Sequence, residues 1–187
     1  EIKISLLKKI DKVFGKGLNY YLDPKAVAAE IREKLYPAFN SFKKEFLKSL
    51  IAKFAEHNIF VFEFVENWNT KEKVNINGFY LSPDTIVLKR NQKSFRREIF
   101  TLIHELGHYL LDEEEIDEHI NEDNPDYNSL NKIERWCNDF AYYFLAGEHD
   151  KILIALETAN SNNDYHHDIL FSIAEQTNLS VFALYTR

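Results

Sequence analysis

The sequence lacks the features that would tie it to a membrane or to a disulfide-stabilised fold. No apolar run approaches the roughly 20 residues that a membrane-spanning helix needs, and charges interrupt the first segment, EIKISLLKKIDKVF, where a signal peptide would be apolar. The single cysteine, Cys137, cannot form an internal disulfide, which fits a reducing compartment. We therefore expect a soluble, cytoplasmic protein without membrane contact. Methionine is also absent, even at position 1, so we expect the natural amino terminus to be missing or processed.

The net charge of −7 comes from one segment that has many acidic residues and no basic ones. Residues 112–126 contain nine acidic residues and no Lys or Arg, so the rest of the chain is close to neutral. Neither part has the strongly basic balance of a nucleic-acid-binding protein, and we expect no direct nucleic-acid partner. We interpret the acidic segment as a solvated loop rather than as a docking site for a basic partner.

The chain has enough apolar material for a core, with 45% hydrophobic and 14% aromatic residues among 187. Apolar residues at a spacing of 3.6 predict helices, and runs of β-branched and aromatic residues predict strands. The predicted helices cover residues 2–14, 24–35, 41–57, 94–111 and 128–146, followed by two or three at the carboxy end, and the predicted strands cover 59–65, 74–81 and 85–89. This order favours an α+β fold with a small antiparallel, three-stranded sheet.

Several helix ends are marked by residues with a specific capping role. Asp23 before Pro24 and Ser94 before the 94–111 helix are of the types that cap helix N-termini. Asn58 and Gly147 are of the types that adopt the left-handed conformation after a helix. We expect residues 1–158 to form the main domain and 159–187 a helical pair, with the softest joint at 159–164.

The sequence His104-Glu105-Leu106-Gly107-His108 is a HExxH motif inside a predicted helix. Residues four apart lie one turn above each other, so both imidazoles can reach one metal ion while Glu105 projects beside them. Two histidines leave a tetrahedral zinc shell half filled, and catalytic zinc sites usually add one more protein ligand and keep the last position for water. The motif therefore predicts a catalytic zinc site with Glu105 as general base.

The third ligand must come from elsewhere in the chain. The extended pattern HExxHxxGxxH is absent, because Leu111 and Glu114 stand where it needs Gly and His. Glu134, in the next long helix, is the best-placed candidate, and Asn138 lies on the same helical face, where it can brace a ligand by a hydrogen bond. His119, in the acidic segment, is the second choice.

Two segments carry a resemblance to a known family. Residues 97–110 (REIFTLIHELGHYL) and 134–145 (ERWCNDFAYYFL) together resemble the ImmA/IrrE family of metallopeptidases, whose pattern is a HELGH helix followed by Glu-x-x-Ala-Asn-x-Phe-Ala. Residues 167–187 are similar to the helical pair that follows the peptidase core of that family. The chain departs from the pattern at Cys137, where the family has Ala, and at 146–147, where Ala-Gly replaces Met-Pro. We interpret Cys137 as a small buried packing residue.

The resemblance implies a zincin-like fold of the gluzincin type, with His104, His108 and Glu134 as zinc ligands and Glu105 as the base. It also implies a protein substrate, a helix-turn-helix transcriptional repressor or an antitoxin of a toxin–antitoxin pair. The donor that would stabilise the oxyanion is not assigned. Five side chains are suitable by type, although a packing or surface role is favoured for each of them: Tyr109, Tyr142, Tyr143, His166 and His167.

Two other function classes stay open. A metallopeptidase-fold toxin or regulator that acts by protein binding would keep its biological activity after Glu105→Gln, whereas a peptidase would lose it. A DNA-associated regulator would use the carboxy-terminal helices, but residues 181–187 carry one basic side chain among mostly apolar ones, which favours packing over DNA reading.

Overall fold

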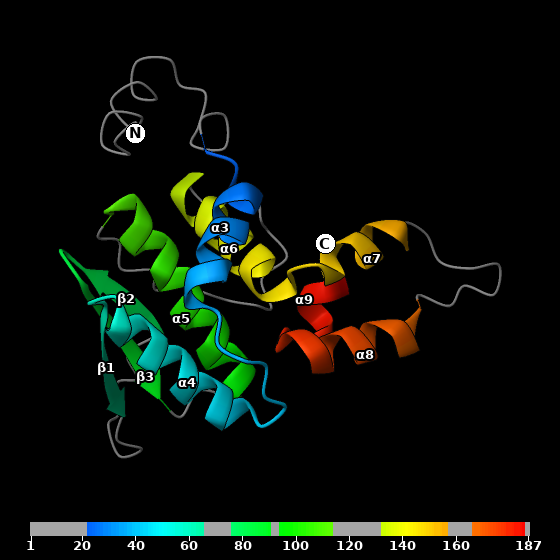
Figure 1. Cartoon of the computed structure of the whole chain (residues 1–187), viewed down its shortest axis with the longest axis horizontal. Coiled ribbons are helices and arrows are strands. Elements are labelled where there is room, and N and C mark those ends of the chain that lie inside the picture. Colours follow the sequence, from blue (N-terminus) through cyan, green and yellow to red (C-terminus); the bar gives the residue numbers. More distant parts are fainter. Residues whose placement is uncertain (1–21, 66–75, 91–93, 114–131, 157–165, 186–187) are drawn as a thin grey trace.

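The computed structural model describes residues 22–65, 76–90, 94–113, 132–156 and 166–185. Within them the fold is α+β, with a three-stranded sheet at one side, long helices against it, and a smaller group of helices at the other side (Figure 1). The elements are α3 (Pro24–Leu35), α4 (Lys43–Glu56), β1 (Phe60–Val65), β2 (Gly78–Leu81), β3 (Thr85–Arg90), α5 (Phe95–Leu111), α6 (Lys132–Ala146), α7 (His149–Ala155), α8 (His167–Thr177) and α9 (Val181–Tyr185). No described helix is long and apolar enough to cross a membrane.

The sheet is mixed, and the prediction of an antiparallel sheet is wrong for one of its two strand pairs. The strand order is β1-β3-β2, with β1 parallel and β2 antiparallel to β3. Only residues 82–84 separate β2 from β3, and so short a turn requires antiparallel pairing. The link from β1 to β2 spans residues 66–77, which is long enough for β3 to take the position between them.

One face of the sheet contributes to the hydrophobic core. Ile86 and Leu88 of β3 and Tyr80 of β2 are buried there, together with apolar residues of α4 and α5. Side chains alternate along a strand, so the neighbouring residues of β3 and β2 point to the opposite face, where Leu81 is exposed. The helices of the core therefore cover one face of the sheet.

The predicted capping residues act as expected. The side chain of Asp23 accepts a hydrogen bond from the Lys25 N–H, and Ser94 accepts one from the Arg97 N–H. Asn58 and Gly147 are left-handed, with φ of 59° and 54°. Local chemistry therefore determines where α3, α4, α5 and α6 begin or end.

The predicted carboxy-terminal helical pair is present as α8 and α9. Polar contacts join α8 to the rest of the fold: Lys43 Nζ lies 2.7 Å from a carboxylate oxygen of Glu175, which also pairs with Arg96 of α5. Several predictions lie outside the described residues, namely the helix over 2–14, a helix start at 128 or 129, the joint at 159–164, and His119.

Candidate metal centre

Helix α5 carries the HExxH motif and is largely buried. Its sequence places apolar residues on the sides that face the sheet and α6, and Ile99, Leu102 and Leu106 are fully buried. His104 and His108 are fully buried as well, and Glu105 is 1% exposed. Burial of three polar side chains in one helix is costly unless they have partners, so their surroundings matter.

A close contact between two helices brings α6 to α5. A Cβ atom added to Gly107 would lie 3.0 Å from Cys137 Sγ and 3.1 Å from its Cβ, so glycine at this position is what permits the approach. Cys137 is fully buried against Gly107, as predicted for a small packing residue. The Gly of the HELGH motif thus has a packing role that places α6 beside the two histidines.

The first turn of α6 places Glu134 against both histidines. One Glu134 oxygen lies 3.2 Å from His104 Nε2, and the other lies 3.0 Å from His108 Nε2. The two Nε2 atoms lie 3.1 Å apart. These residues form a buried group of side chains that could hold a metal ion, with one donor atom of each within 4.8 Å of the others.

The donor set fits zinc. Zinc bonds of about 2.0 to 2.2 Å in a tetrahedral arrangement separate neighbouring ligand atoms by about 3.3 to 3.6 Å. The two Nε2 atoms lie 3.1 Å apart, and each lies 3.0 to 3.2 Å from a different Glu134 oxygen, so the donors are close enough together to share one ion. Two imidazoles and one carboxylate are also a ligand set that catalytic zinc sites use, and they leave one position for water.

A hydrogen bond orients the first histidine. Nδ1 of His104 lies 3.0 Å from Oδ1 of Asn138, one turn after Glu134 on α6. The amide oxygen is an acceptor, so Nδ1 donates the proton of this hydrogen bond. Nε2 is the ring nitrogen that faces Glu134 and His108, and it is therefore the nitrogen that is placed to bind a metal.

The charge state of Glu134 is set by two opposed effects. Burial by itself would raise the pKa of this carboxyl group, but hydrogen bonds and coulombic attraction from His104 and His108 outweigh it and lower the pKa well below its usual range. Glu134 is therefore a carboxylate at neutral pH. A bound cation would interact with this buried negative charge in place of the histidine protons.

Strand β2 passes close to the motif at Glu105. A Cβ atom on Gly78 would lie 3.2 Å from Glu105 Cγ and 2.8 Å from Thr101 Cγ2. Glycine at 78 therefore lets the strand lie directly against the α5 face that carries the predicted base. Gly78 was not among the residues predicted to matter for the site, although an isolated glycine in a strand pattern is the usual sign of a close backbone approach.

A second contact joins β2 to the end of α5. Asp112 is the left-handed C-cap of α5, with φ of 53°, and its carboxylate accepts a hydrogen bond from the Tyr80 hydroxyl at 3.2 Å. The Tyr80 ring packs edge-on against Tyr109. This contact was not predicted from the sequence, because nothing in the spacing of residues 80 and 112 indicates that they meet.

The candidate oxyanion donors lie in packing or surface contacts. Tyr109 packs against Tyr80, and Tyr142 is buried with its ring edge-on to Tyr143. His167 is exposed and contacts the Tyr185 hydroxyl at the start of α8. His166 is the left-handed residue just before α8.

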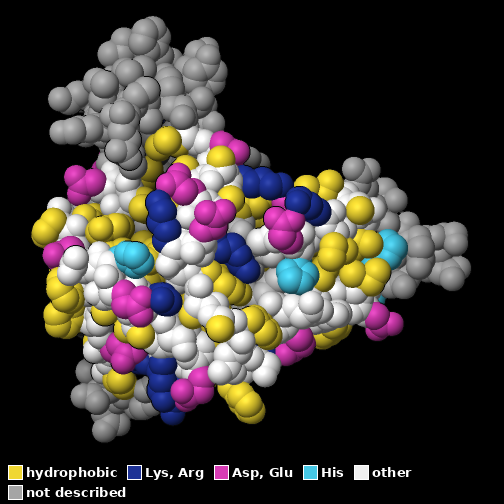
Figure 2. Space-filling view, in the orientation of Figure 1, with side chains coloured by type: hydrophobic (Ala, Val, Ile, Leu, Met, Phe, Trp, Pro, Cys, Tyr) yellow, Lys and Arg dark blue, Asp and Glu magenta, His cyan; other side chains and the backbone are white. Residues whose placement is uncertain are grey.

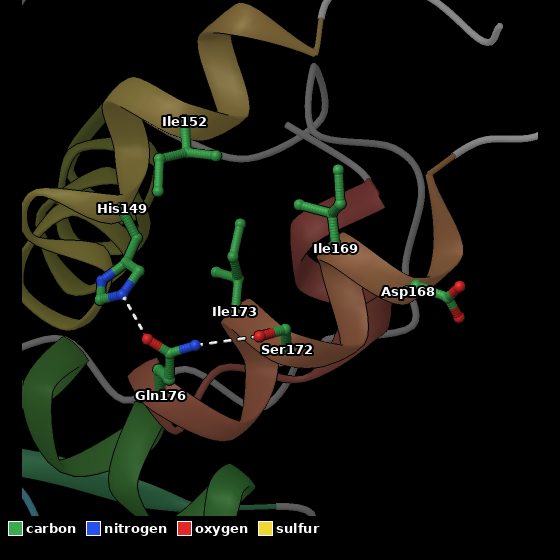
Figure 3. Close-up of a pocket in the computed structure, with 7 residues that line it drawn as sticks. All are labelled: His149, Ile152, Asp168, Ile169, Ser172, Ile173 and Gln176. Atoms are coloured by element: carbon green, nitrogen blue, oxygen red, sulfur yellow. Dashed lines mark hydrogen bonds between the residues drawn. The ribbon is translucent and has the colours of Figure 1, made fainter.

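A separate cavity of about 310 Å³ lies between α7 and α8 (Figure 3). Three isoleucine side chains line it, and a hydrogen-bonded row crosses one end, from His149 through Gln176 to Ser172. Among the described residues, its side chains do not belong to the group that could hold a metal ion. The metal centre is therefore distinct from this cavity.

Comparison with protein families identifies one match. The profile of the peptidase M78 family, described as the IrrE N-terminal-like domain, matches residues 54–187. This range includes the sheet, α5 with its HExxH motif, and α6 with Glu134. Comparisons with curated proteins and with solved structures gave no significant match. The chain belongs to the peptidase M78 family, the ImmA/IrrE family of metallopeptidases, as residues 97–110 and 134–145 predicted.

Proposed function

We propose that this protein is a zinc-dependent endopeptidase with His104, His108 and Glu134 as metal ligands and Glu105 as general base. The observation that carries the proposal is that the buried Nε2 atoms of His104 and His108 lie 3.1 Å apart, and that each lies within 3.2 Å of an oxygen of the buried Glu134 carboxylate. Membership of a metallopeptidase family supports it independently.

The side chains divide the chemical work between them. When bound, zinc lowers the pKa of a coordinated water to about 7 and polarises the substrate carbonyl. Glu105 takes a proton from the attacking water and passes it to the leaving amine. The hydrogen bond from His104 Nδ1 to Asn138 orients the ring so that Nε2 would be the ligand atom. Full burial of the two histidines limits competition from bulk water.

A protein is the proposed substrate, and a helix-turn-helix transcriptional repressor or an antitoxin is the specific expectation. Family membership is the support for this step, since the geometry of the ligands is the same for any peptide bond. The cytoplasm is the proposed location, because such repressors act there.

Metal content is the first test. Elemental mass spectrometry of purified protein should give about one zinc per chain, and His104→Ala and Glu134→Ala should each lose most of it. His57→Ala and Glu56→Ala are matched controls, since both side chains are exposed at the end of α4 and should keep the metal. Wild-type protein that stays free of zinc after zinc is supplied would refute the proposal.

Catalysis is tested separately with Glu105→Gln. This variant should keep its zinc but no longer cleave helix-turn-helix repressors that are encoded beside this protein. Mass spectrometry of the reaction products measures the cleavage. If both proteins bind zinc but wild type and Glu105→Gln do not differ in cleavage or in the biological response, a regulator that acts by protein binding is favoured.

A further inference from the structure

Strand β1 leaves one edge of the sheet open among the described residues. The Phe60 N–H donates to the Asp84 carbonyl at 2.8 Å, so the main-chain groups of Phe60 point toward β3. Main-chain direction alternates along a strand, and the N–H and C=O groups of Val61 and Glu63 therefore point away from β3. β1 lies at the end of the strand order, and this edge offers hydrogen-bonding groups to another strand.

The side chains of this edge are unusually apolar. Phe60, Phe62 and Phe64 alternate with the other residues and share the sheet face opposite the core, where Phe60 is 48% and Phe62 61% exposed. Figure 2 shows hydrophobic side chains gathered at the left margin, over the region where Figure 1 draws β1. Proteins usually protect an open edge with proline, lysine or a bulge. β1 has a single charged residue, Glu63, and that carboxylate pairs with Arg90 of β3 in the same chain.

We propose that β1 is a self-association edge, at which two copies of the chain pair their β1 strands antiparallel about a two-fold axis at Phe62. The three phenylalanines are symmetric about that position, so Phe62 faces the partner's Phe62 and Phe60 faces the partner's Phe64. These are aromatic cross-strand pairs, which stabilise antiparallel strands. The outward main-chain groups of Val61 and Glu63 then bond to those of the second copy.

Charge and area determine the register and the strength of this association. In the register centred on Phe62, each Glu63 faces the partner's Val61, whereas a register centred on Glu63 would place two carboxylates directly opposite. Phe60 and Phe62 together leave roughly 200 Å² of ring surface exposed per copy. A standard stable interface buries about 800 Å² per partner, so the dimer is weak and reversible.

The association leaves the metal centre accessible. β2 forms the opposite edge of the sheet, and Gly78 of β2 is the residue that packs against Glu105. A second copy on β1 therefore adds strands at the far side of the sheet from the HExxH helix. Self-association is separate from the proposed peptidase activity and does not depend on it.

Sedimentation equilibrium of the whole protein over a wide concentration range tests the proposal. Wild type should show a reversible monomer–dimer equilibrium, and Phe62→Lys or Phe62→Glu should each raise the dissociation constant at least about tenfold, because like charges meet at the two-fold axis. An equimolar mixture of these two variants should dimerise again, since Lys then faces Glu. Phe171→Lys and Phe171→Glu are matched controls, because Phe171 is 57% exposed on α8.

Three results would overturn the proposal: wild type that is monomeric at all concentrations, Phe62 variants that dimerise like wild type, or equal losses in the Phe171 variants. A cysteine crosslink tests the register directly. Non-hydrogen-bonded antiparallel partners have Cα atoms about 4.5 Å apart, within disulfide range, so Phe62→Cys should form a covalent dimer under mild oxidation. The native Cys137 is buried, and Phe171→Cys serves as the control. Crosslinking of Phe62→Cys that is no faster than that of the control would refute the register.

Discussion

Replacing Gly107 by alanine tests whether the contact between α5 and α6 assembles the metal centre. In an exposed helix interior this change would stabilise the helix by about 1 kcal/mol, since alanine has the higher helix propensity. Here the new methyl group would meet three atoms of Cys137, at 3.0 Å from Sγ, 3.1 Å from Cβ and 3.2 Å from Cα. Two of these atoms belong to or adjoin the α6 backbone and cannot turn aside by a rotamer change. Overpacking of this kind costs about 1 to 3 kcal/mol, so the clash should outweigh the gain in propensity.

Movement of α6 should also weaken metal binding. Relief of the clash requires a shift of a few tenths of an ångström or more, and it separates Glu134, on α6, from the two histidines on α5. We expect the free energy of unfolding of the metal-free protein to fall by roughly 1 to 2 kcal/mol and zinc affinity to fall about tenfold or more. Urea denaturation in the presence of a chelator measures the first quantity, and competition with a chromophoric chelator measures the second.

A double-mutant cycle separates the clash from other effects. Cys137→Gly removes two of the three atoms that the new methyl group would meet, so Gly107→Ala should be much less damaging in that background than in wild type. Increased stability with unchanged zinc affinity in the single variant Gly107→Ala would refute the reasoning. So would a cycle in which the two changes are additive.

Three further predictions follow from other contacts. Asn138→Ala should lower zinc affinity about 10- to 100-fold through loss of its hydrogen bond to His104, measured by chelator competition, and an unchanged affinity would contradict this role. The hydrogen bond from Lys25 to Asp150, at 2.5 Å, raises the pKa of Lys25 above its ordinary value of 10.5. The stability difference between wild type and Lys25→Ala should therefore be present at neutral pH and disappear as the pH rises through this raised pKa. A difference that persists in denaturation curves above that pH would exclude the ion pair as its source. Gly147→Ala should destabilise the fold by roughly 1 to 2 kcal/mol in urea denaturation because its φ of 54° is left-handed, and unaltered stability would show that the turn can relax.

The amino-acid sequence by itself determined the structural features that depend only on residues a few positions apart in the chain. The four-residue spacing of His104 and His108 places both on one side of a helix in any fold that keeps the helix. Ser94 and Asn58 mark a helix start and a helix end because their hydrogen bonds and backbone angles are local. The same locality explains why the HExxH motif indicated a metal site before any tertiary contact was known.

Tertiary structure alone decided which distant residues meet. Spacing made Glu134 the best candidate but left His119 open, and only the Gly107–Cys137 contact shows how α6 comes close enough for the Glu134 carboxylate to face both imidazoles. The parallel pairing of β1 with β3 was missed for the same reason, since hydrophobic pattern predicts which residues form strands but not the partner or direction of each strand. These choices depend on side-chain packing between segments far apart in the chain, where a difference of one methyl group at a helix contact decides how closely two elements can approach.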